Sequence, residues 1–161
     1  MTEVWVMDAS PLILLGKSGQ LEWLPRMGRI IIPESVATEI VAGPPGDPAR
    51  LWLESPDGRA SISDDPKVTT ELLAWDLGRG ETAVISMTAG HPSSEAVLDD
   101  AAARRCAAAF AVRMRGTLSF VALAKKPGLI RACRPVFENM QAAGLFLSQA
   151  LVDQVALSVG E

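Results

Sequence analysis

The sequence has little of what several classes of site and compartment require. It contains one histidine, His91, which excludes a histidine-rich metal site. Its two cysteines, Cys106 and Cys133, fit no paired metal-ligand spacing, so we expect two reduced thiols. No apolar run approaches the roughly 20 residues that span a bilayer. No basic region or small-residue cleavage site precedes the first predicted strand, so we expect a cytoplasmic protein without a signal peptide.

Positive charge is also scarce. With 15 Lys and Arg against 19 Asp and Glu, the net charge is −4, which argues against a simple basic platform for nucleic acid. A nucleic-acid enzyme remains compatible with this charge, because bound divalent cations can supply positive charge near its site. The 161 residues are 48% hydrophobic, enough to bury a core, so we expect a single domain over 1–161.

The stretch from Val4 to Pro11 organises the chain. Four apolar residues, 4–7, run into Asp8, and such a run is typical of a strand buried on both faces of a parallel sheet. Ser10 is predicted to cap a helix with Pro11 at its first position. Asp8 is thus expected at a strand's carboxyl end, where sites of open α/β sheets form. The alternative is an Asp that is solvated in a turn or caps the helix.

Further strands and helices alternate along the chain. This alternation predicts an α/β sandwich with a parallel sheet. Strands are predicted at 29–32 and 95–98, with short ones near 60–62 and 111–113. Helices are predicted at 11–17, 20–26, 33–42, 48–54, 66–77 (ending at a Gly78 cap), 81–89, an alanine-rich stretch to about Phe110, 117–126 with Thr117 as its cap, 131–143 and 148–158.

This pattern of strands and helices is expected to bring several acidic side chains to one edge of the sheet. Asp99 and Asp100 end the strand at 95–98 as Asp8 ends the first strand, so parallel pairing would bring them to one edge of the sheet. Glu81 continues the apolar face of its helix, where an unpaired carboxylate is costly and a bound cation would remove the cost. Glu39 borders the apolar stripe of the helix at 33–42. For both glutamates the alternative is an ordinary helix position, which for Glu81 is first-turn placement favoured by the helix dipole.

Carboxylates brought together repel one another unless a cation neutralises them. Oxygen ligands alone suit Mg²⁺ or Mn²⁺ and disfavour zinc, and such an ion supports phosphodiester hydrolysis. Ser10 and Thr117, at helix starts facing the same edge, are candidates for orienting water or phosphate. Arg104 is a candidate for contacting a phosphate, although a solvated helix face explains it equally well.

Five motifs in order resemble the PIN domain family, most closely its DUF3368 branch. They are Asp8-x-Ser10-Pro11-Leu12, Ile32-Pro33-x-x-Val36-x-x-Glu39, Leu77-Gly78-x-Gly80-Glu81-x-x-x-Ile85, Leu98-Asp99-Asp100-x-x-Ala103-Arg104 and Gly116-Thr117-Leu118. The resemblance implies a three-layer α/β/α fold and an acidic Mg²⁺ or Mn²⁺ site that cuts RNA. By position, the acids carried over are Asp8, Glu39, Glu81 and Asp99 or Asp100, with Asp8, Glu81, Asp99 and Asp100 as the expected metal ligands.

Many relatives in this family resemble toxins of toxin–antitoxin pairs, so the resemblance also implies a small antitoxin protein as a partner. The chain departs from the toxin pattern at Glu81, which sits in a Gly-Glu motif where many such toxins have an Asp further along the helix. A homodimer is expected as well, because the segment 11–24 carries more apolar surface than one sheet face can cover, and the resemblance also implies one. Its apolar residues are Leu12, Leu15, Leu21, Trp23 and Leu24.

Other interpretations explain less of the sequence. A haloacid-dehalogenase-like phosphatase needs a second Asp where Ser10 stands. A receiver-like phosphoacceptor leaves Glu39 and Glu81 unexplained. The serious alternative is a PIN-like module that binds RNA or a protein without cutting.

Overall fold

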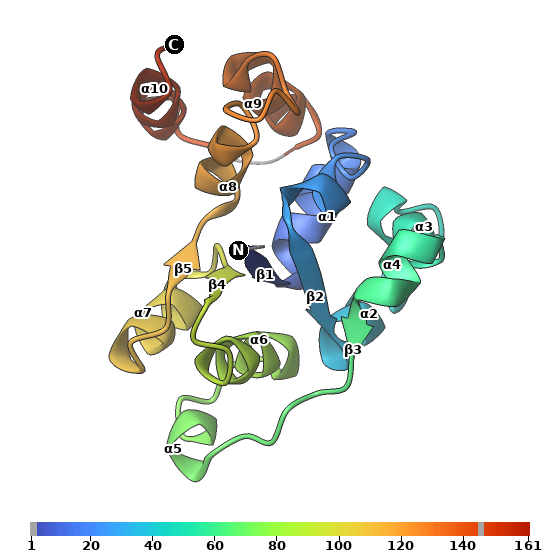
Figure 1. Ribbon diagram of the computed structural model, residues 1–161, viewed down its shortest axis with the longest axis vertical. Helices are drawn as coiled ribbons and strands as arrows, with labels where there is room; N and C mark the ends of the chain where they lie inside the picture. Colours follow the sequence, from blue (N-terminus) through green and yellow to red (C-terminus); the bar gives the residue numbers. More distant parts are fainter. Residues whose placement is uncertain (1–2, 145–146) are drawn as a thin grey trace.

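Five parallel strands form the centre of the molecule (Figure 1). The computed structural model describes residues 3–144 and 147–161. The strand order is β3-β2-β1-β4-β5, and every neighbouring pair is parallel. The strands are β1 Val4–Met7, β2 Arg29–Pro33, β3 Ile62–Ser63, β4 Ser94–Val97 and β5 Met114–Arg115. The chain builds outward from β1 to β3 and then returns to the other side of β1, so the order reverses between β1 and β4.

Helices cover both faces of the sheet, which confirms the three-layer α/β/α prediction. The helix α6 contacts β1, β2 and β4 on one face, and α1 lies on the other with α3 and α9 against it (Figure 1).

No helix among the described residues is both long and apolar enough to span a bilayer. The helices are α1 Ala9–Lys17, η1 (a 3₁₀ turn) Leu24–Met27, α2 Glu34–Val41, α3 Pro48–Leu53, α4 Pro56–Ser61, α5 Thr70–Leu73, α6 Arg79–Ala89, α7 Ala101–Ala109, α8 Thr117–Leu123, α9 Cys133–Ala142 and α10 Gln149–Ser158.

The central strands are buried, as their unbroken apolar runs predict. Trp5, Val6 and Met7 of β1 are at most 2% exposed. The indole of Trp5 meets the ring of Phe120 edge-on at 5.0 Å between ring centroids, which ties the sheet to α8. Both cysteines are buried free thiols, as expected.

Several helix boundaries differ from the prediction because local caps and turns prevail over apolar spacing. The predicted helix at 66–77 shrinks to α5, which the Thr69 side chain caps and which ends before Asp76, where φ is +53°. Gly78 consequently starts α6 instead of ending a helix. The unpredicted α4 has Ser55 as its cap and Pro56 in its first turn, a signal that was present in the sequence.

Other boundaries shift at the starts of helices. Asp8 itself is the N-cap of α1, so Ser10 lies inside the first turn and its prediction as the cap was wrong. Gly116 takes the cap position predicted for Thr117. The last strand lies at β5 instead of 111–113, since Ala111 turns the chain with φ +54°. The predicted helix at 20–26 is only the 3₁₀ turn η1, which contains Pro25.

The reasoning behind the homodimer was wrong in its premise. The five apolar side chains of 11–24 on which it rested are at most 7% exposed within one chain, in a shared core with the sheet. These side chains therefore leave almost no exposed apolar surface that a second copy could cover. The homodimer itself therefore stays a prediction without that support.

Candidate active site

Five carboxylates line one cleft of about 560 Å³ at the carboxyl ends of β1 and β4. This acidic cleft is lined by Asp8, Ala9, Ser10, Glu39, Gly78, Gly80, Glu81, Asp99 and Asp100. It lies where the strand order reverses, the place at which open α/β sheets form their binding crevices. The structure therefore brings together all five acids that the sequence singled out.

Asp8 is the buried member of the cleft. It follows β1 directly, is 4% exposed, and its backbone N–H donates to the Val97 carbonyl oxygen of β4 at 3.3 Å. Its backbone caps α1, but its carboxylate makes no side-chain capping bond. Burial, followed by the charges of Glu81, Glu39 and Asp99, raises the pKa of Asp8 to about 7 against an opposing hydrogen bond from the Ala9 N–H.

Glu39 and Glu81 come from α2 and α6, two helices in direct contact. Gly80 makes their approach possible: a Cβ there would stand 3.0 Å from Glu39 Oε2 and 3.8 Å from Asp8 Oδ1. Burial, then the charges of Asp100 and Glu39, raises the pKa of Glu81, while the Gly78 N–H opposes the shift. Glu39 is exposed at the rim. The missing side chain at position 80 thus leaves the space into which the carboxylates project.

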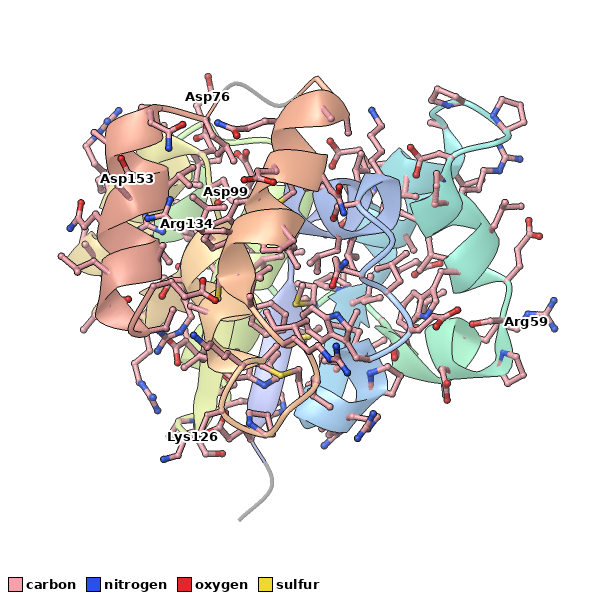
Figure 2. The ribbon with its side chains drawn as sticks, turned by 90° about the horizontal axis from the view of Figure 1, so that it is seen from above. Arg59, Asp76, Asp99, Lys126, Arg134 and Asp153 are labelled. Carbon is pink, nitrogen blue, oxygen red and sulfur yellow. The ribbon has the colours of Figure 1, made fainter. Side chains whose placement is uncertain are left out.

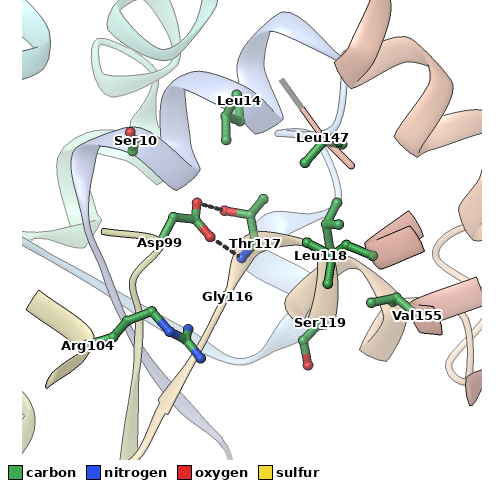
Figure 3. A pocket seen from close by; sticks show the side chains of 11 residues that line it. Ser10, Leu14, Asp99, Arg104, Gly116, Thr117, Leu118, Ser119, Leu147 and Val155 are labelled. Atoms are coloured by element: carbon green, nitrogen blue, oxygen red, sulfur yellow. Dashed lines mark hydrogen bonds between the residues drawn. The ribbon is translucent and has the colours of Figure 1, made fainter. Parts of the chain in front are cut away.

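The two aspartates after β4 are held in different ways. Asp99 Oδ1 accepts the Thr117 backbone N–H at 2.8 Å, and Asp99 Oδ2 accepts the Thr117 hydroxyl at 2.5 Å (Figure 3). Asp100 caps α7 by accepting the Ala103 N–H at 2.9 Å. Both remain exposed to the cleft. Thr117 is 2% exposed and points at Asp99, so in this structure its hydroxyl positions a carboxylate.

The other two predicted substrate-binding residues lie at the edge of the cleft. Ser10 is exposed in the first turn of α1 and belongs both to the cleft and to a neighbouring cavity. Arg104 lines that neighbouring cavity, where its Nη1 donates to the Leu98 carbonyl oxygen at 2.9 Å. Arg104 forms no ion pair within the described part of the chain.

Sequence reasoning missed Asp65, which braces the two glutamate-bearing helices. Its Oδ1 accepts both the backbone N–H and the hydroxyl of Ser35, at 2.9 and 3.0 Å, in the first turn of α2. Its Oδ2 lies 3.6 Å from Arg79 Nε at the start of α6. An acid in a loop 30 residues from its partner gives no local signal, so only the fold reveals this role.

The cleft offers a metal ion only oxygen ligands. Within residues 3–144 and 147–161, no three His, Cys, Asp or Glu side chains converge closely enough to hold an ion by themselves. Mg²⁺ and Mn²⁺ fit such a set, because these ions keep several water ligands and need only one or two direct carboxylates. The crowding of like charges around Asp8 and the open space beside Gly80 are consistent with a small hydrated cation.

The comparisons with known proteins agree with this architecture. A family model covers residues 4–161, nearly the whole chain, and its description is PIN domain; the chain belongs to the PIN domain family. The matching model is DUF3368, the branch that the sequence motifs resemble, so that prediction is confirmed. No curated protein and no solved structure matches the chain.

Proposed function

We propose that this protein is a metal-dependent endoribonuclease that hydrolyses RNA phosphodiester bonds. The observation that supports it most is the cleft itself. Five carboxylates from four separate segments of the chain line it, and one of them, Asp8, is buried among the others. Structural carboxylates are normally paired with cations or donors. A group of acids held together in an open cleft instead favours a ligand that carries positive charge.

Each residue of the cleft has a distinct proposed role. Asp8, Glu81, Asp99 and Asp100 would hold Mg²⁺ or Mn²⁺, and Glu39 at the rim would complete the negative field around it. The bound ion would lower the pKa of a water molecule and stabilise negative charge on the departing oxygen. Thr117 fixes the rotamer of Asp99 through two hydrogen bonds, and Gly80 keeps the cleft open. Ser10, exposed at the cleft's edge, is placed to donate a hydrogen bond to phosphate or water.

The direct test is cleavage of a labelled single-stranded RNA in Mg²⁺ or Mn²⁺, in EDTA, and with the Asp8→Asn variant. We expect EDTA to abolish cleavage and Asp8→Asn to slow it by roughly two orders of magnitude, about 2.7 kcal/mol of activation free energy. Glu34→Gln is the matched control, because Glu34 is exposed in the first turn of α2 and lies outside the cleft. Full activity in EDTA would refute the mechanism.

A second measurement does not depend on activity. A cation that binds the folded cleft and not the unfolded chain raises the melting temperature, by roughly 2.7 kcal/mol of stability at 100 times its Kd. We expect Mg²⁺ or Mn²⁺ to stabilise the wild type and to stabilise Asp8→Asn much less. Equal stabilisation of both proteins would place the ion elsewhere.

The alternative function is a PIN-like module that binds RNA or a protein without cutting. Two observations favour it: no three acids converge among the described residues, and Asp99 and Asp100 already serve as hydrogen-bond acceptors for α8 and α7. It predicts RNA binding that weakens with salt, with no cleavage in any divalent cation. The RNA cleavage assay separates it from the nuclease.

Family membership also supports a role as the toxin of a toxin–antitoxin pair, acting in the cytoplasm with a small antitoxin protein as its partner. The test is growth arrest on expression of the wild type and normal growth with Asp8→Asn. Arrest by both variants would mean that RNA cleavage is not the cause.

A further inference from the structure

A second cavity, of about 520 Å³, adjoins the acidic cleft (Figure 3). The two share Ser10 and Asp99, so they meet along one edge. An extended ligand whose reacting group lies among the acids can therefore place a neighbouring group in this side cavity. The residues that line it come from α1, α7, α8 and α10, from the loops after β4 and β5, and from the segment just before α10.

The side cavity has two kinds of wall. Leucine and valine side chains form the apolar part: Leu14 of α1, Leu118 of α8, Leu147 just before α10, and Leu151 and Val155 of α10. Polar groups form the other part: the hydroxyls of Ser10, Thr117 and Ser119, the Asp99 carboxylate and the Arg104 guanidinium. A planar group with apolar faces and hydrogen-bonding edges matches both. A nucleobase has that chemistry, and a purely aliphatic side chain would leave the polar wall without a partner.

Arg104 lies where the side cavity meets the cleft. A Cβ on Gly116 would stand 3.3 Å from Asp99 Oδ1 and 3.4 Å from Arg104 Nη1, so these two side chains flank the same backbone position. The Leu98 carbonyl holds one nitrogen of the guanidinium and leaves the others for a ligand. A chain passing from cleft to side cavity meets this cation, which attracts a phosphodiester and repels a lysine or arginine of a protein partner.

We propose that the side cavity binds the nucleobase next to the scissile phosphate and that Arg104 contacts the phosphate between them. This inference rests on the proposed ribonuclease function and specifies its substrate. A base can enter the cavity only after it leaves its stack, so the substrate is RNA that is single-stranded at the cut.

The first experiment compares RNA oligonucleotides that each lack one base but keep every sugar and phosphate. Binding is measured by fluorescence anisotropy in Mn²⁺ with the Asp8→Asn chain, within a time over which its roughly 100-fold slower cleavage consumes little RNA. We expect loss of the base beside the cleaved bond to weaken binding about tenfold, and loss of distant bases to change it less than twofold. A flat response across all positions overturns the proposal.

The second experiment fills the side cavity. In the same background, Leu151→Trp should weaken binding of intact RNA about tenfold and abolish the difference between intact and abasic RNA. Leu157→Trp is the matched control, because Leu157 lies on the same helix, is 75% exposed and does not line the cavity. If Leu151→Trp still binds intact RNA more tightly than abasic RNA by the same factor, the base binds elsewhere. That result overturns the proposal and favours a protein partner as the ligand of the cavity.

The third experiment tests the cation. Arg104→Gln should weaken RNA binding several-fold and lower its salt dependence by about one phosphate contact, whereas Arg105→Gln, on an exposed neighbour outside the cavity, should do neither. Equal effects of the two substitutions overturn the role of Arg104. Wild-type cleavage in Mn²⁺ decides the ribonuclease proposal separately, so failure of either proposal is visible on its own.

Discussion

Carboxylates lie at helix N-termini in two regions of this molecule, with different surroundings. In the acidic cleft, the buried Asp8 carboxylate is surrounded by the negative charges of Glu81, Glu39 and Asp99. Near the C-terminus, the Glu161 carboxylate is surrounded by donors: its oxygens accept the Cys133 N–H at 2.9 Å and the Arg134 N–H at 3.2 Å, and Oε1 lies 3.1 Å from Lys125 Nζ. Arg134 also pairs with Asp153 at 2.9 Å, joining α9 to α10 (Figure 2).

The two regions shift carboxyl pKa values in opposite directions. Burial acts to raise the pKa of Glu161, but the hydrogen bonds from Lys125, Cys133 and Arg134 outweigh it and lower the pKa overall. In the cleft, burial and neighbouring carboxylates raise the pKa of Asp8 to about 7. Ionised Glu161 thus stabilises the fold, whereas ionised Asp8 destabilises it. The difference separates an acid that is paired with donors from a buried acid among like charges, which the proposed cation would stabilise.

The largest expected effect is on the rate of cleavage. Asp99→Asn should reduce it by roughly two orders of magnitude or more. The same substitution should also lower the free energy of unfolding by about 1 kcal/mol. Both Asp99 oxygens accept hydrogen bonds from Thr117, and the NH₂ group of an asparagine cannot accept one of them. Asp100→Asn should reduce the rate less, and the comparison identifies which aspartate binds the ion. A larger loss for Asp100→Asn would reverse the assignment.

The second largest expected effect is on the free energy of unfolding in the absence of metal. The pKa of Asp8 is about 7 in the folded protein against an ordinary value of 3.8, so the folded state holds more protons between these two pH values. The free energy of unfolding in EDTA should therefore fall as pH rises from about 4 to 7. Asp8→Asn should remove that fall and stabilise the protein by on the order of 2 kcal/mol at pH 8. Urea unfolding at pH 5 and pH 8 measures both.

Glu161→Gln should act in the opposite direction. It should destabilise the protein by about 1 kcal/mol at pH 7, since it weakens the charge-assisted bonds to Lys125 and to the start of α9. Because the folded pKa is lowered, this stabilisation is present above the ordinary value of 4.5 and is lost as pH falls through the folded pKa. Glu138→Gln on the exposed face of α9 is the control. A loss that is independent of pH would assign the effect to packing.

The smallest effect belongs to a surface ion pair. Arg79 lies 3.6 Å from Asp65, but its side chain is 86% exposed. Arg79→Gln should change the free energy of unfolding by less than about 0.5 kcal/mol, because solvent screens such pairs. Thermal unfolding in low and high salt measures it. A change as large as that of Glu161→Gln would show that the donors around Glu161 are not what distinguishes it.

The sequence predicted the sheet and the acids of the cleft for the same reason. A strand buried on both faces leaves an unbroken apolar run, and the residue that ends it, such as Asp8 or Asp99, lies at the sheet's edge. Glu81 was found because its carboxylate lies in line with the apolar face of its helix. The bonds that hold these acids escaped prediction because their partners are distant in sequence: Thr117 lies 18 residues from Asp99, and the cap at Ser35 comes from Asp65.

The reversal of strand order between β1 and β4 has a consequence for the folding chain. The first half of the sequence contributes Asp8 and Glu39, and the second half contributes Glu81, Asp99 and Asp100. Neither half contains the whole set of acids, so the cleft exists only once β4 has docked beside β1. If the cleft is the proposed ribonuclease site, that site is incomplete whenever β4 is not docked beside β1, as in a partly unfolded chain. Its activity would report native assembly of the two halves.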